Sequence, residues 1–232
     1  MPTNQNEMVE VRTWVKIPDL SEMPKVLPCL VYCKPQGDIG QAKSWILSLP
    51  ELAKADSLLP QSRRIYCAAH VVLRLVLAHF TGIAPEILAI ANLVESKPFL
   101  PNHTLKFNLS HTENAFLIAV SNQEIGVDIE EIHNDLDFEG IMDFAFSESD
   151  KMLCDKHDLP NAFTQMWTLK EAYTKAIGTG LSENLSEINI SGPKSVLNQD
   201  GYCSSTFICP GNEIGSVVCG QDLTGLLFFE LL

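Results

Sequence analysis

The chain has 232 residues, which is enough for one substantial domain or for two small ones that share a core. Hydrophobic residues make up 46% and charged residues 19%, as is typical of an ordinary globular protein. The formal net charge is −13, and the 16 lysines and arginines are dispersed along the chain, so we do not expect nucleic-acid binding.

The cysteines and the apolar runs indicate the compartment. Seven cysteines are scattered without a C-x-x-C pair, which favours buried reduced thiols over a zinc site or a disulfide framework. We find no apolar run long enough to span a bilayer and no basic-then-apolar leader at the N-terminus. We therefore expect a cytoplasmic protein without a membrane partner.

The first part of the chain mixes strands and helices. Residues 1–25 are polar and are predicted to be irregular, whereas the apolar, β-branched run 26–33 predicts a strand. A short helix over 39–48 is predicted to stop near Pro50. The long helix over 61–82 has the strongest pattern, because its apolar residues recur at helical spacing and a glycine supplies the stop.

Three short strands follow, over 104–111, 115–121 and 124–130. Only Asn122 and Gln123 separate the last two, which predicts a tight hairpin.

The second part of the chain again mixes the two kinds of element. Helices are predicted over 138–157 and 161–177. The tail has short apolar runs that predict antiparallel strands, at 188–190, 206–209, 216–219 and 226–232. Because strands and helices do not alternate strictly, α+β is the expected class. A seam near residue 123 would divide the chain into two halves, 1–123 and 124–232.

Residues 126–130 read GVDIE. Side chains alternate along a strand, so Asp128 and Glu130 share one face while Val127 and Ile129 share the other. Two like charges on one face are tolerable where both face water, or where a cation lies between them. A solvent-facing edge is the commoner case, but the flanking apolar residues favour a core strand whose other face opens on a cleft.

A second polar pattern lies in WTLKEAYTKAIGTG, residues 167–180. On a helix, Lys170, Glu171 and Lys175 fall within one arc, and the apolar residues fall mostly on the other side. Taken alone, this is the pattern of a solvated face with an i,i+4 ion pair. Together with Asp128 and Glu130, however, Glu171 would complete a set of three carboxylates, the hard oxygen ligands that Mg²⁺ prefers.

Other polar residues are weak indicators when each is taken alone. Ser110 and His111 end the strand 104–111, where such residues usually form turns. Lys97 precedes a proline and is therefore held extended. Arg63 and Arg64 stand at the helix end that the macrodipole disfavours for cations, which hints at an anionic ligand, although a solvated surface pair is the simpler interpretation.

These segments occur together, in this order, in one family. The sequence resembles the 4′-phosphopantetheinyl transferase superfamily of the Sfp type. The resemblance extends over residues 61–190 and rests on KP (97–98), FNLSHT (107–112), GVDIE (126–130), FSESD (146–150) and WTLKEAYTKAIG (167–178). It implies an α+β fold of two similar halves, packed as an intramolecular pseudo-dimer with the active site between them, and hence a monomer.

The resemblance also implies a reaction. A 4′-phosphopantetheine group would pass from coenzyme A, the co-substrate, to a serine of an apo acyl or peptidyl carrier protein, with release of adenosine 3′,5′-bisphosphate. The implied metal is Mg²⁺, or Mn²⁺ in its place, and its implied ligands are Asp128, Glu130 and Glu171. The implied catalytic residues are Glu171 (as base), Lys175 and Asp150. The implied coenzyme A contacts are Lys97, Ser110, His111, Lys170, Lys175 and Arg64.

Two departures from the family pattern stand out. Asp150 occupies a place where the family often has glutamate. Leu52 and Ala55 stand where relatives have two lysines, and Lys54 is shifted from either place. Part of the phosphate-binding rim is therefore expected to be lost or rebuilt.

The carrier surface and the rival functions remain open. Carrier proteins are usually acidic, so docking would rely on a local apolar or basic patch. Our candidate is the segment 138–160, for which an ordinary amphipathic helix is an equally good interpretation. Its residues of interest are Phe144, Phe146, Lys151, Met152 and Lys156. The alternative function is a non-catalytic member of the fold that binds coenzyme A or a carrier. A coenzyme A-dependent acyltransferase lacks support, because thioester chemistry needs no Mg²⁺ site.

Overall fold

Two β-sheets organise the part of the chain that the computed structural model describes. That part comprises residues 9–10, 12–36, 40–91, 97–154, 156–179, 185–188, 190, 196–197, 201–220 and 222–232. Sheet I has the order β2-β10-β3-β5-β4, with β2 (Val15–Ile17), β3 (Cys29–Cys33), β4 (Lys106–His111), β5 (Phe116–Ser121) and β10 (Leu227–Leu231). Sheet II has the order β1-β8-β9-β6, with β1 (Val9–Glu10), β6 (Ile125–Glu130), β8 (Tyr202–Ile208) and β9 (Ile214–Cys219), and β7 (Val196–Leu197) pairs with β8.

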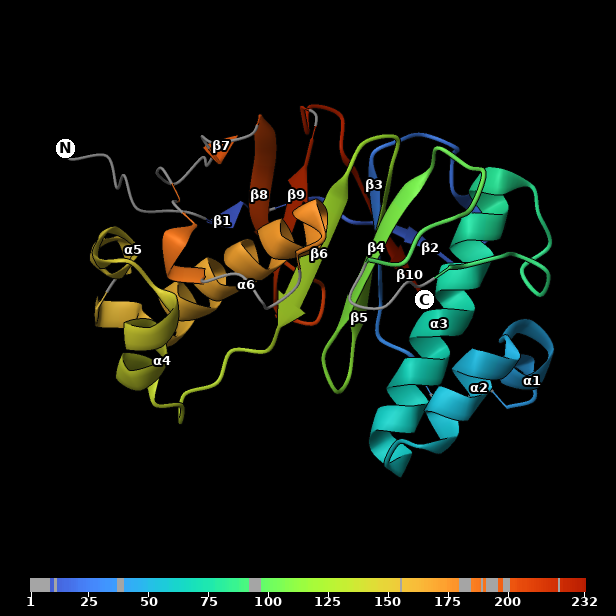
Figure 1. Cartoon of the computed structure of the whole chain (residues 1–232), viewed down its shortest axis with the longest axis horizontal. Coiled ribbons are helices and arrows are strands. Elements are labelled where there is room, and N and C mark those ends of the chain that lie inside the picture. The colour runs from blue at the N-terminus through green and yellow to red at the C-terminus, as the bar shows by residue number, and fades with distance from the viewer. Residues whose placement is uncertain are drawn as a thin grey trace.

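Each sheet has a long helix on one face (Figure 1). Sheet I carries α3 (Pro60–Thr81), against which α1 (Ala42–Ile46) and α2 (Leu49–Asp56) pack. Sheet II carries α6 (Leu159–Ile177), with α4 (Phe138–Ala145) and α5 (Glu148–Leu153) beside it. Single turns of 3₁₀ helix lie at Leu20–Glu22, Lys156–Asp158 and Leu185–Glu187.

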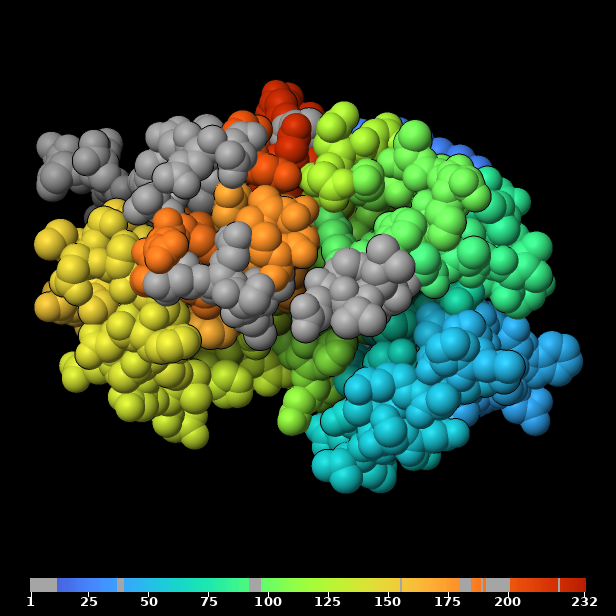
Figure 2. All heavy atoms as spheres, viewed as in Figure 1, coloured from blue at the N-terminus to red at the C-terminus, as the bar shows by residue number. Residues whose placement is uncertain are grey.

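Apolar clusters hold the layers together. One lies between α3 and sheet I, and another between α6 and sheet II. A third joins the two sheets and includes Leu30, Leu117, Val127, Val217 and Phe228. The layers therefore follow the order α3, sheet I, sheet II, α6. In Figure 2 most of the first half of the chain (blue to green) lies at one end of the molecule, and most of the second (yellow to red) at the other. The α+β class is confirmed.

The most regular sequence patterns are confirmed by the structure. The helix expected over 61–82 is α3, and Gly82 ends it with a φ of 73°, a left-handed conformation that glycine adopts without strain. The strands expected over 104–111, 115–121 and 124–130 are β4, β5 and β6.

The predicted hairpin at Asn122 and Gln123 is wrong. β5 pairs with β3 and β4 in sheet I, whereas β6 pairs with β9 in sheet II. The tight connection therefore carries the chain from one sheet to the other. A short loop limits where the next strand begins, but it does not decide which edge that strand joins.

The prediction of an irregular N-terminal region is also wrong in part. β1 pairs with β8 and β2 pairs with β10, both in parallel. β10 in turn lies beside β3 in sheet I, so its pairings are parallel and not antiparallel as predicted. Each sheet thus contains a strand from the other end of the chain. The prediction of a strand over 188–190 fails at Ile188 and Ile190, and Asn189 lies outside the described residues.

Two helix predictions need correction at their boundaries. Only 42–46 of the segment 39–48 forms α1, and residue 39 lies outside the described residues. Pro50 does not simply stop that helix but stands in the first turn of α2, where its missing N–H costs nothing. The segment 138–157 is broken at Phe146, because Ser147 caps a new helix, α5.

Helix α3 is long and apolar enough, by length and composition alone, to cross a membrane. The expectation that no segment reaches this length is therefore not met. Half of its most apolar 18-residue stretch is buried against the rest of the fold, as in the core helix of a globular protein, so this finding is weak evidence for a span. None of the seven cysteines forms a disulfide, and six of them are buried, as predicted.

Candidate active site

The site forms where the edges of the two sheets meet. β4 is the edge strand of sheet I, β6 is the edge strand of sheet II, and they lie side by side (Figure 1). Side chains of β4 bridge the two edges instead of a backbone ladder. The Val127 amide donates to Asn108 Oδ1 at 2.9 Å, and Ser110 Oγ donates to Asp128 Oδ1 at 2.8 Å. The edge of β6 that faces away from β9 thereby gains partners from the first half of the chain.

The packing of α6 against β6 directs the two acids of GVDIE. Gly126 lies so close to α6 that a Cβ at this position would collide with the backbone of Ala172 and Ala176. Val127 and Ile129 enter the cluster between the sheets, so Asp128 and Glu130 face the other way. The predicted division of this strand into an apolar and an acidic face is therefore observed.

Helix α6 brings a cation to these acids. Lys175 Nζ lies 2.5 Å from Asp128 Oδ1 and donates to Ser110 Oγ at 3.0 Å. β4, β6 and α6 each supply one member of this cluster. The Lys175 side chain is 29% exposed, so its ammonium remains open to a ligand.

Uncompensated negative charge remains at the cluster. Asp128 Oδ2 and Glu171 Oε1 are both buried without a hydrogen-bond partner. Burial and the nearby Asp128 charge raise the pKa of Glu171. Burial and Asp128 also raise the pKa of Glu130 to about 7, with smaller contributions from Glu171 and Glu131 and opposition from Lys175. Both shifts reflect burial first and the nearness of other carboxylates second.

The three carboxylates do not form a complete metal site in the described part of the chain. Within the described ranges, no three His, Cys, Asp or Glu side chains stand close enough to hold a metal ion as they are. The predicted ligand set of Asp128, Glu130 and Glu171 is thus brought to one region, with the unpartnered oxygens on Asp128 and Glu171.

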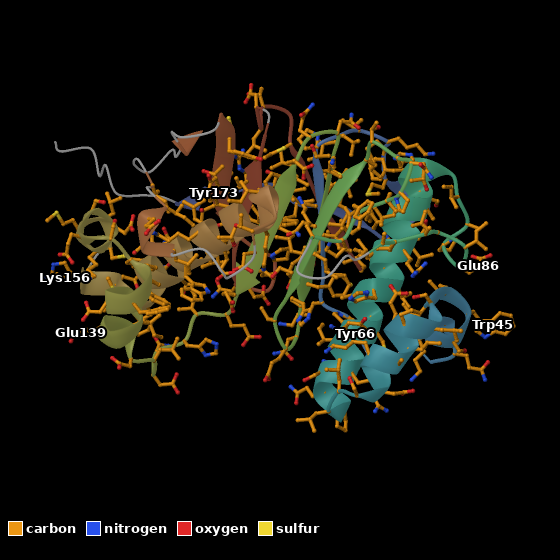
Figure 3. All side chains as sticks on the ribbon, viewed as in Figure 1. Trp45, Tyr66, Glu86, Glu139, Lys156 and Tyr173 are labelled. Carbon is orange, nitrogen blue, oxygen red and sulfur yellow. The ribbon has the colours of Figure 1, made fainter. Side chains whose placement is uncertain are left out.

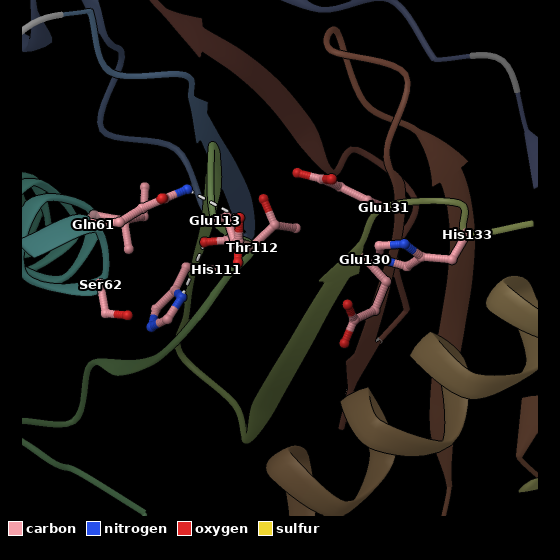
Figure 4. Close-up of a pocket in the computed structure, with 9 residues that line it drawn as sticks. Gln61, Ser62, His111, Thr112, Glu113, Glu130, Glu131 and His133 are labelled. Carbon is pink, nitrogen blue, oxygen red and sulfur yellow. Dashed lines mark hydrogen bonds between the residues drawn. The ribbon is translucent and has the colours of Figure 1, made fainter. Parts of the chain in front are cut away.

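A cavity of about 430 Å³ opens beside this cluster. Figure 4 shows residues of the β4–β5 connection on one side and residues that end or follow β6 on the other. The lining residues are Gln61, Ser62, Ile65, His111, Thr112, Glu113, Glu130, Glu131 and His133. Gln61 Nε2 donates to Glu113 at 3.0 Å, and Asn114 Nδ2 donates to Glu131 at 2.9 Å, so polar contacts link the cavity walls.

Lys170 and Asp150 lie apart from the cavity, although sequence reasoning placed both in the site. They form an ion pair of 2.7 Å in which both side chains are fully buried. Lys170 Nζ also donates to the carbonyls of Leu185 and Ile188, at 2.6 and 3.0 Å. All three ammonium hydrogens are therefore engaged, and none is left for a coenzyme A phosphate.

The helical arc has, when taken alone, the pattern of a solvated face, but the structure buries it at Lys170. Besides Lys170, Glu171 and Thr174 are also buried. The reason is that α6 has neighbours on several sides: sheet II on one, and α4, α5, residues 185–188 and Ile190 on others. A helical wheel gives angles but cannot show how many faces are covered.

The remaining predicted coenzyme A contacts are spread over the first half. His111 lines the cavity, with its Nδ1 3.3 Å from the carbonyl of Thr112. Arg64 donates to the carbonyl of Pro35 at 3.3 Å. Lys97 is bound to Glu124 and to two backbone carbonyls, away from the cavity.

The contacts of helix α2 account for Arg63 at the start of α3 and for the apolar residues at positions 52 and 55. Arg63 donates to the carbonyls of Ala55, Asp56 and Leu58 at the end of α2, so the unfavourable charge at the start of α3 stabilises another helix end. Leu52 and Ala55, which stand where the family resemblance led us to expect lysines, pack α2 onto α3.

Several residues of the site were not predicted from the sequence. Asn108, Glu131 and His133 line the seam or the cavity, and Gln61 and Asn114 link its walls. Asn108 lies within the FNLSHT segment, and its alternation with Ser110 on the strand could have identified it. The others lie at loop and helix ends, where no periodicity indicates direction.

Fold and site together define an α+β protein with an acidic cleft at the edges of two sheets. Residues 124–207 match the family model of the 4′-phosphopantetheinyl transferase superfamily. The chain is 34% identical to the 4′-phosphopantetheinyl transferase HetI of Nostoc sp. over 62% of this chain and 65% of that protein. It is 34% identical to the 4′-phosphopantetheinyl transferase gsp of Aneurinibacillus migulanus, over 37% of this chain and 36% of that one.

A third relative is the 4′-phosphopantetheinyl transferase Sfp of Bacillus subtilis, 29% identical over 59% of this chain and 67% of that protein. These matches confirm the resemblance to the 4′-phosphopantetheinyl transferase superfamily that the motifs indicated. The chain spans less than two thirds of HetI and about a third of gsp.

Proposed function

We propose that the protein transfers the 4′-phosphopantetheine group of coenzyme A to a serine hydroxyl of an apo acyl or peptidyl carrier protein. The observation that carries the proposal is the meeting of Asp128, Glu171 and Lys175 beside an open cavity at the seam of the two sheets. The names of the relatives, all 4′-phosphopantetheinyl transferases, support the same class of reaction.

In this reaction the serine oxygen attacks the β-phosphorus of the coenzyme A pyrophosphate. A phosphorus–oxygen bond forms to serine, the bond to adenosine 3′,5′-bisphosphate breaks, and a base takes the serine proton. Glu171 is our candidate for the base. Its raised pKa makes it a better proton acceptor than an ordinary carboxylate, and its Oε1 has no other partner.

The carboxylate oxygens at the seam are suitable ligands for a divalent cation, Mg²⁺ or Mn²⁺. The fit rests on the two buried oxygens without partners, Asp128 Oδ2 and Glu171 Oε1, and on the burial and the crowding of acids that together raise the pKa of Glu130. Asp128, Glu130 and Glu171 would hold the ion, since such cations prefer carboxylate oxygens. When bound, the ion would neutralise negative charge on the pyrophosphate.

Four residues of the chain are suited to hold coenzyme A. The Lys175 ammonium is partly exposed and lies beside Ser110, so both can contact a phosphate without moving their elements. His111 faces the cavity and can donate from its ring. Arg64 remains a candidate at the start of α3.

We also propose that 1–123 and 124–232 are related halves of a pseudo-dimer and that the protein is a monomer. Each half supplies most of one sheet and one long helix, α3 or α6, and the site lies between them. β1 and β10, which cross between the sheets, tie the halves together.

For the carrier protein we propose docking on α4 and α5. Phe144 and Met152 are 84% and 83% exposed, which is costly in water unless a partner covers them. Phe146, which the sequence analysis grouped with them, is buried instead. Lys151 is bound to Asp143 and Glu148, so the basic contribution of this surface is small.

The test is the intact mass of an apo acyl-carrier protein after incubation with this protein, coenzyme A and Mg²⁺. We expect a gain of one phosphopantetheine group, abolished by EDTA and by Glu171→Gln. The matched control is Glu86→Gln, because Glu86 is exposed and lies far from the seam (Figure 3).

A single alternative remains, a non-catalytic protein that binds coenzyme A or a carrier. It predicts no mass gain with carriers of several classes, while calorimetry still detects binding of coenzyme A. That pair of results would replace the transferase proposal.

A further inference from the structure

Lys97 joins the two elements that carry the acids of the site. Its ammonium donates to the Ile125 carbonyl at 2.6 Å, to Glu124 Oε2 at 3.1 Å and to the Ala176 carbonyl at 3.4 Å. Ile125 begins β6, and Ala176 stands in the last turn of α6. One side chain from the first half of the chain therefore binds both elements of the second.

Each of these carbonyls is one that its own element cannot satisfy. The last four carbonyls of a helix have no intrahelical partner, and Ala176 is among them. A cation at this end also interacts favourably with the negative end of the helix dipole. β6 is an edge strand, and its neighbour in sheet II is β9, so Lys97 binds it from outside the sheet. Lys97 thus satisfies both elements at once.

Contacts around Lys97 hold it in this position. Its side chain is only 14% exposed, and Lys106 on β4 binds the other oxygen of Glu124 at 2.5 Å. Gly178, which ends α6 with a φ of 84°, lies so that a Cβ there would be 3.8 Å from Lys97 Cβ. Lys97, Glu124 and Lys106 form a connected set that we call the clamp.

The clamp leaves Lys97 without a free donor. An ammonium has three hydrogens, and three acceptors already surround Nζ. Binding a phosphate would require it to abandon at least one carbonyl at the seam. The neighbouring hollow, lined by Lys97, Pro98, Phe99 and Lys106, also contains Glu124, whose charge would oppose a phosphate there.

We propose that Lys97 is a positioning residue, which fixes α6 against β6 and so sets the spacing of Glu171 from Asp128, and that it is not a phosphate contact. The proposal rests on the transferase function proposed above. A displacement of about 1 Å between reacting groups can lower a rate by about a hundredfold, so a residue outside the cavity can control turnover.

The test combines single and double variants in steady-state transfer assays. For Lys97→Met, we expect kcat to fall about tenfold or more while the KM for coenzyme A changes less than about twofold. For Glu124→Gln, we expect a smaller fall of kcat in the same direction. The double variant should be no worse than Lys97→Met, because both changes break one clamp. Lys25→Met, an exposed lysine elsewhere, is the control.

A phosphate contact predicts the opposite pattern. The KM for coenzyme A would rise in Lys97→Met with kcat retained, and Glu124→Gln would lower that KM by freeing the ammonium. Either result overturns the proposal. If Lys97→Met does not fold, Glu124→Gln alone decides, since the two accounts give it opposite effects.

A readout without activity separates this proposal from the transferase function. Hydrogen exchange of peptides covering 125–130 and 170–178 should quicken in Lys97→Met and stay unchanged in Lys25→Met. Should the wild-type protein transfer nothing to any carrier, this exchange pattern still tests the clamp. Unchanged exchange in a folded Lys97→Met protein would overturn it.

Discussion

Two aspartate–lysine pairs join α6 to its surroundings, and they differ in one respect that decides their roles. Asp128–Lys175 lies beside a cavity, with a second and a third carboxylate near it. Asp150–Lys170 is fully buried, and its lysine is saturated by backbone carbonyls. Both aspartates have an oxygen without a hydrogen-bond partner, so such an atom does not by itself indicate a functional site. What distinguishes the Asp128–Lys175 pair is that solvent can reach it.

The buried Asp150–Lys170 pair, which we call the closed pair, should contribute more to the free energy of unfolding than the Asp128–Lys175 pair. Lys170→Met removes one partner and leaves the Asp150 carboxylate uncompensated in the core, which typically costs about 3–5 kcal/mol. We expect chemical denaturation to show this loss of free energy of unfolding. Lys151→Met, at a half-buried lysine of α5 whose ion-pair partners are exposed, should change little. Equal effects of the two variants would contradict the assigned role of the closed pair.

The Asp128–Lys175 pair beside the cavity, which we call the open pair, should matter more for the transfer activity than the closed pair. Asp128→Asn removes a candidate metal ligand and the anchor of Lys175, and we expect transfer to fall by about a hundredfold or more, equivalent to about 3 kcal/mol. Stability should be unchanged or higher, because the change relieves repulsion with Glu130 and Glu171. A rate assay and a denaturation curve on the same preparation check both parts.

A pH series with and without Mg²⁺ sharpens the same comparison. The pKa of Glu130 is raised to about 7 in the folded state, so the folded protein holds this proton more tightly than the unfolded chain does. The resulting stabilisation is fully present below pH about 4.3 and is lost as the pH rises through 7. We expect a decline of up to about 3 kcal/mol without metal. Mg²⁺ should reduce that decline. An identical pH profile with and without Mg²⁺ would count against cation binding.

Glu51, in the first half of the chain, is a carboxylate whose pKa is lowered and not raised. Burial alone would raise the pKa of Glu51, but hydrogen bonds from His70 and Ser48 and the charge of Arg74 lower it to about 2. Tyr66, labelled on α3 in Figure 3, stacks on His70 with ring centroids 4.0 Å apart.

Because the folded pKa of Glu51 is depressed, its contribution of about 2–3 kcal/mol is present above pH about 4.3 and is lost as pH falls towards 2. Comparing wild type with Glu51→Gln in acid denaturation measures it. The variant should be less stable at neutral pH and should converge with wild type at pH about 2. A constant difference at every pH would refute this assignment.

The sequence was sufficient for elements with long or strict periodicity. α3 and β6 were predicted because 22 residues of helical spacing and a strict alternation leave few other structures. β1 and β2 could not be predicted, because they have two and three residues and exist through pairing with β8 and β10, nearly two hundred residues away. Sheet membership of β6 is a long-range property of the same kind.

For the site, residue types were easier to predict than surroundings. Asp128, Glu171 and Lys175 were predicted from their motifs, and the structure brings them together. Lys170 stands next to Glu171 in the sequence and on the helical wheel, but its side chain lies in a closed core. What distinguishes them is the packing of α5 and residues 185–188, which no local pattern encodes.

The most direct test of this account compares Asp128→Asn with Asp150→Asn, each at a temperature where it is folded, by the mass of an apo carrier protein over time. We predict that Asp128→Asn is stable and nearly inactive, whereas Asp150→Asn is less stable but transfers at close to the wild-type rate per folded molecule. A stable, inactive Asp150→Asn beside an active Asp128→Asn would contradict the account.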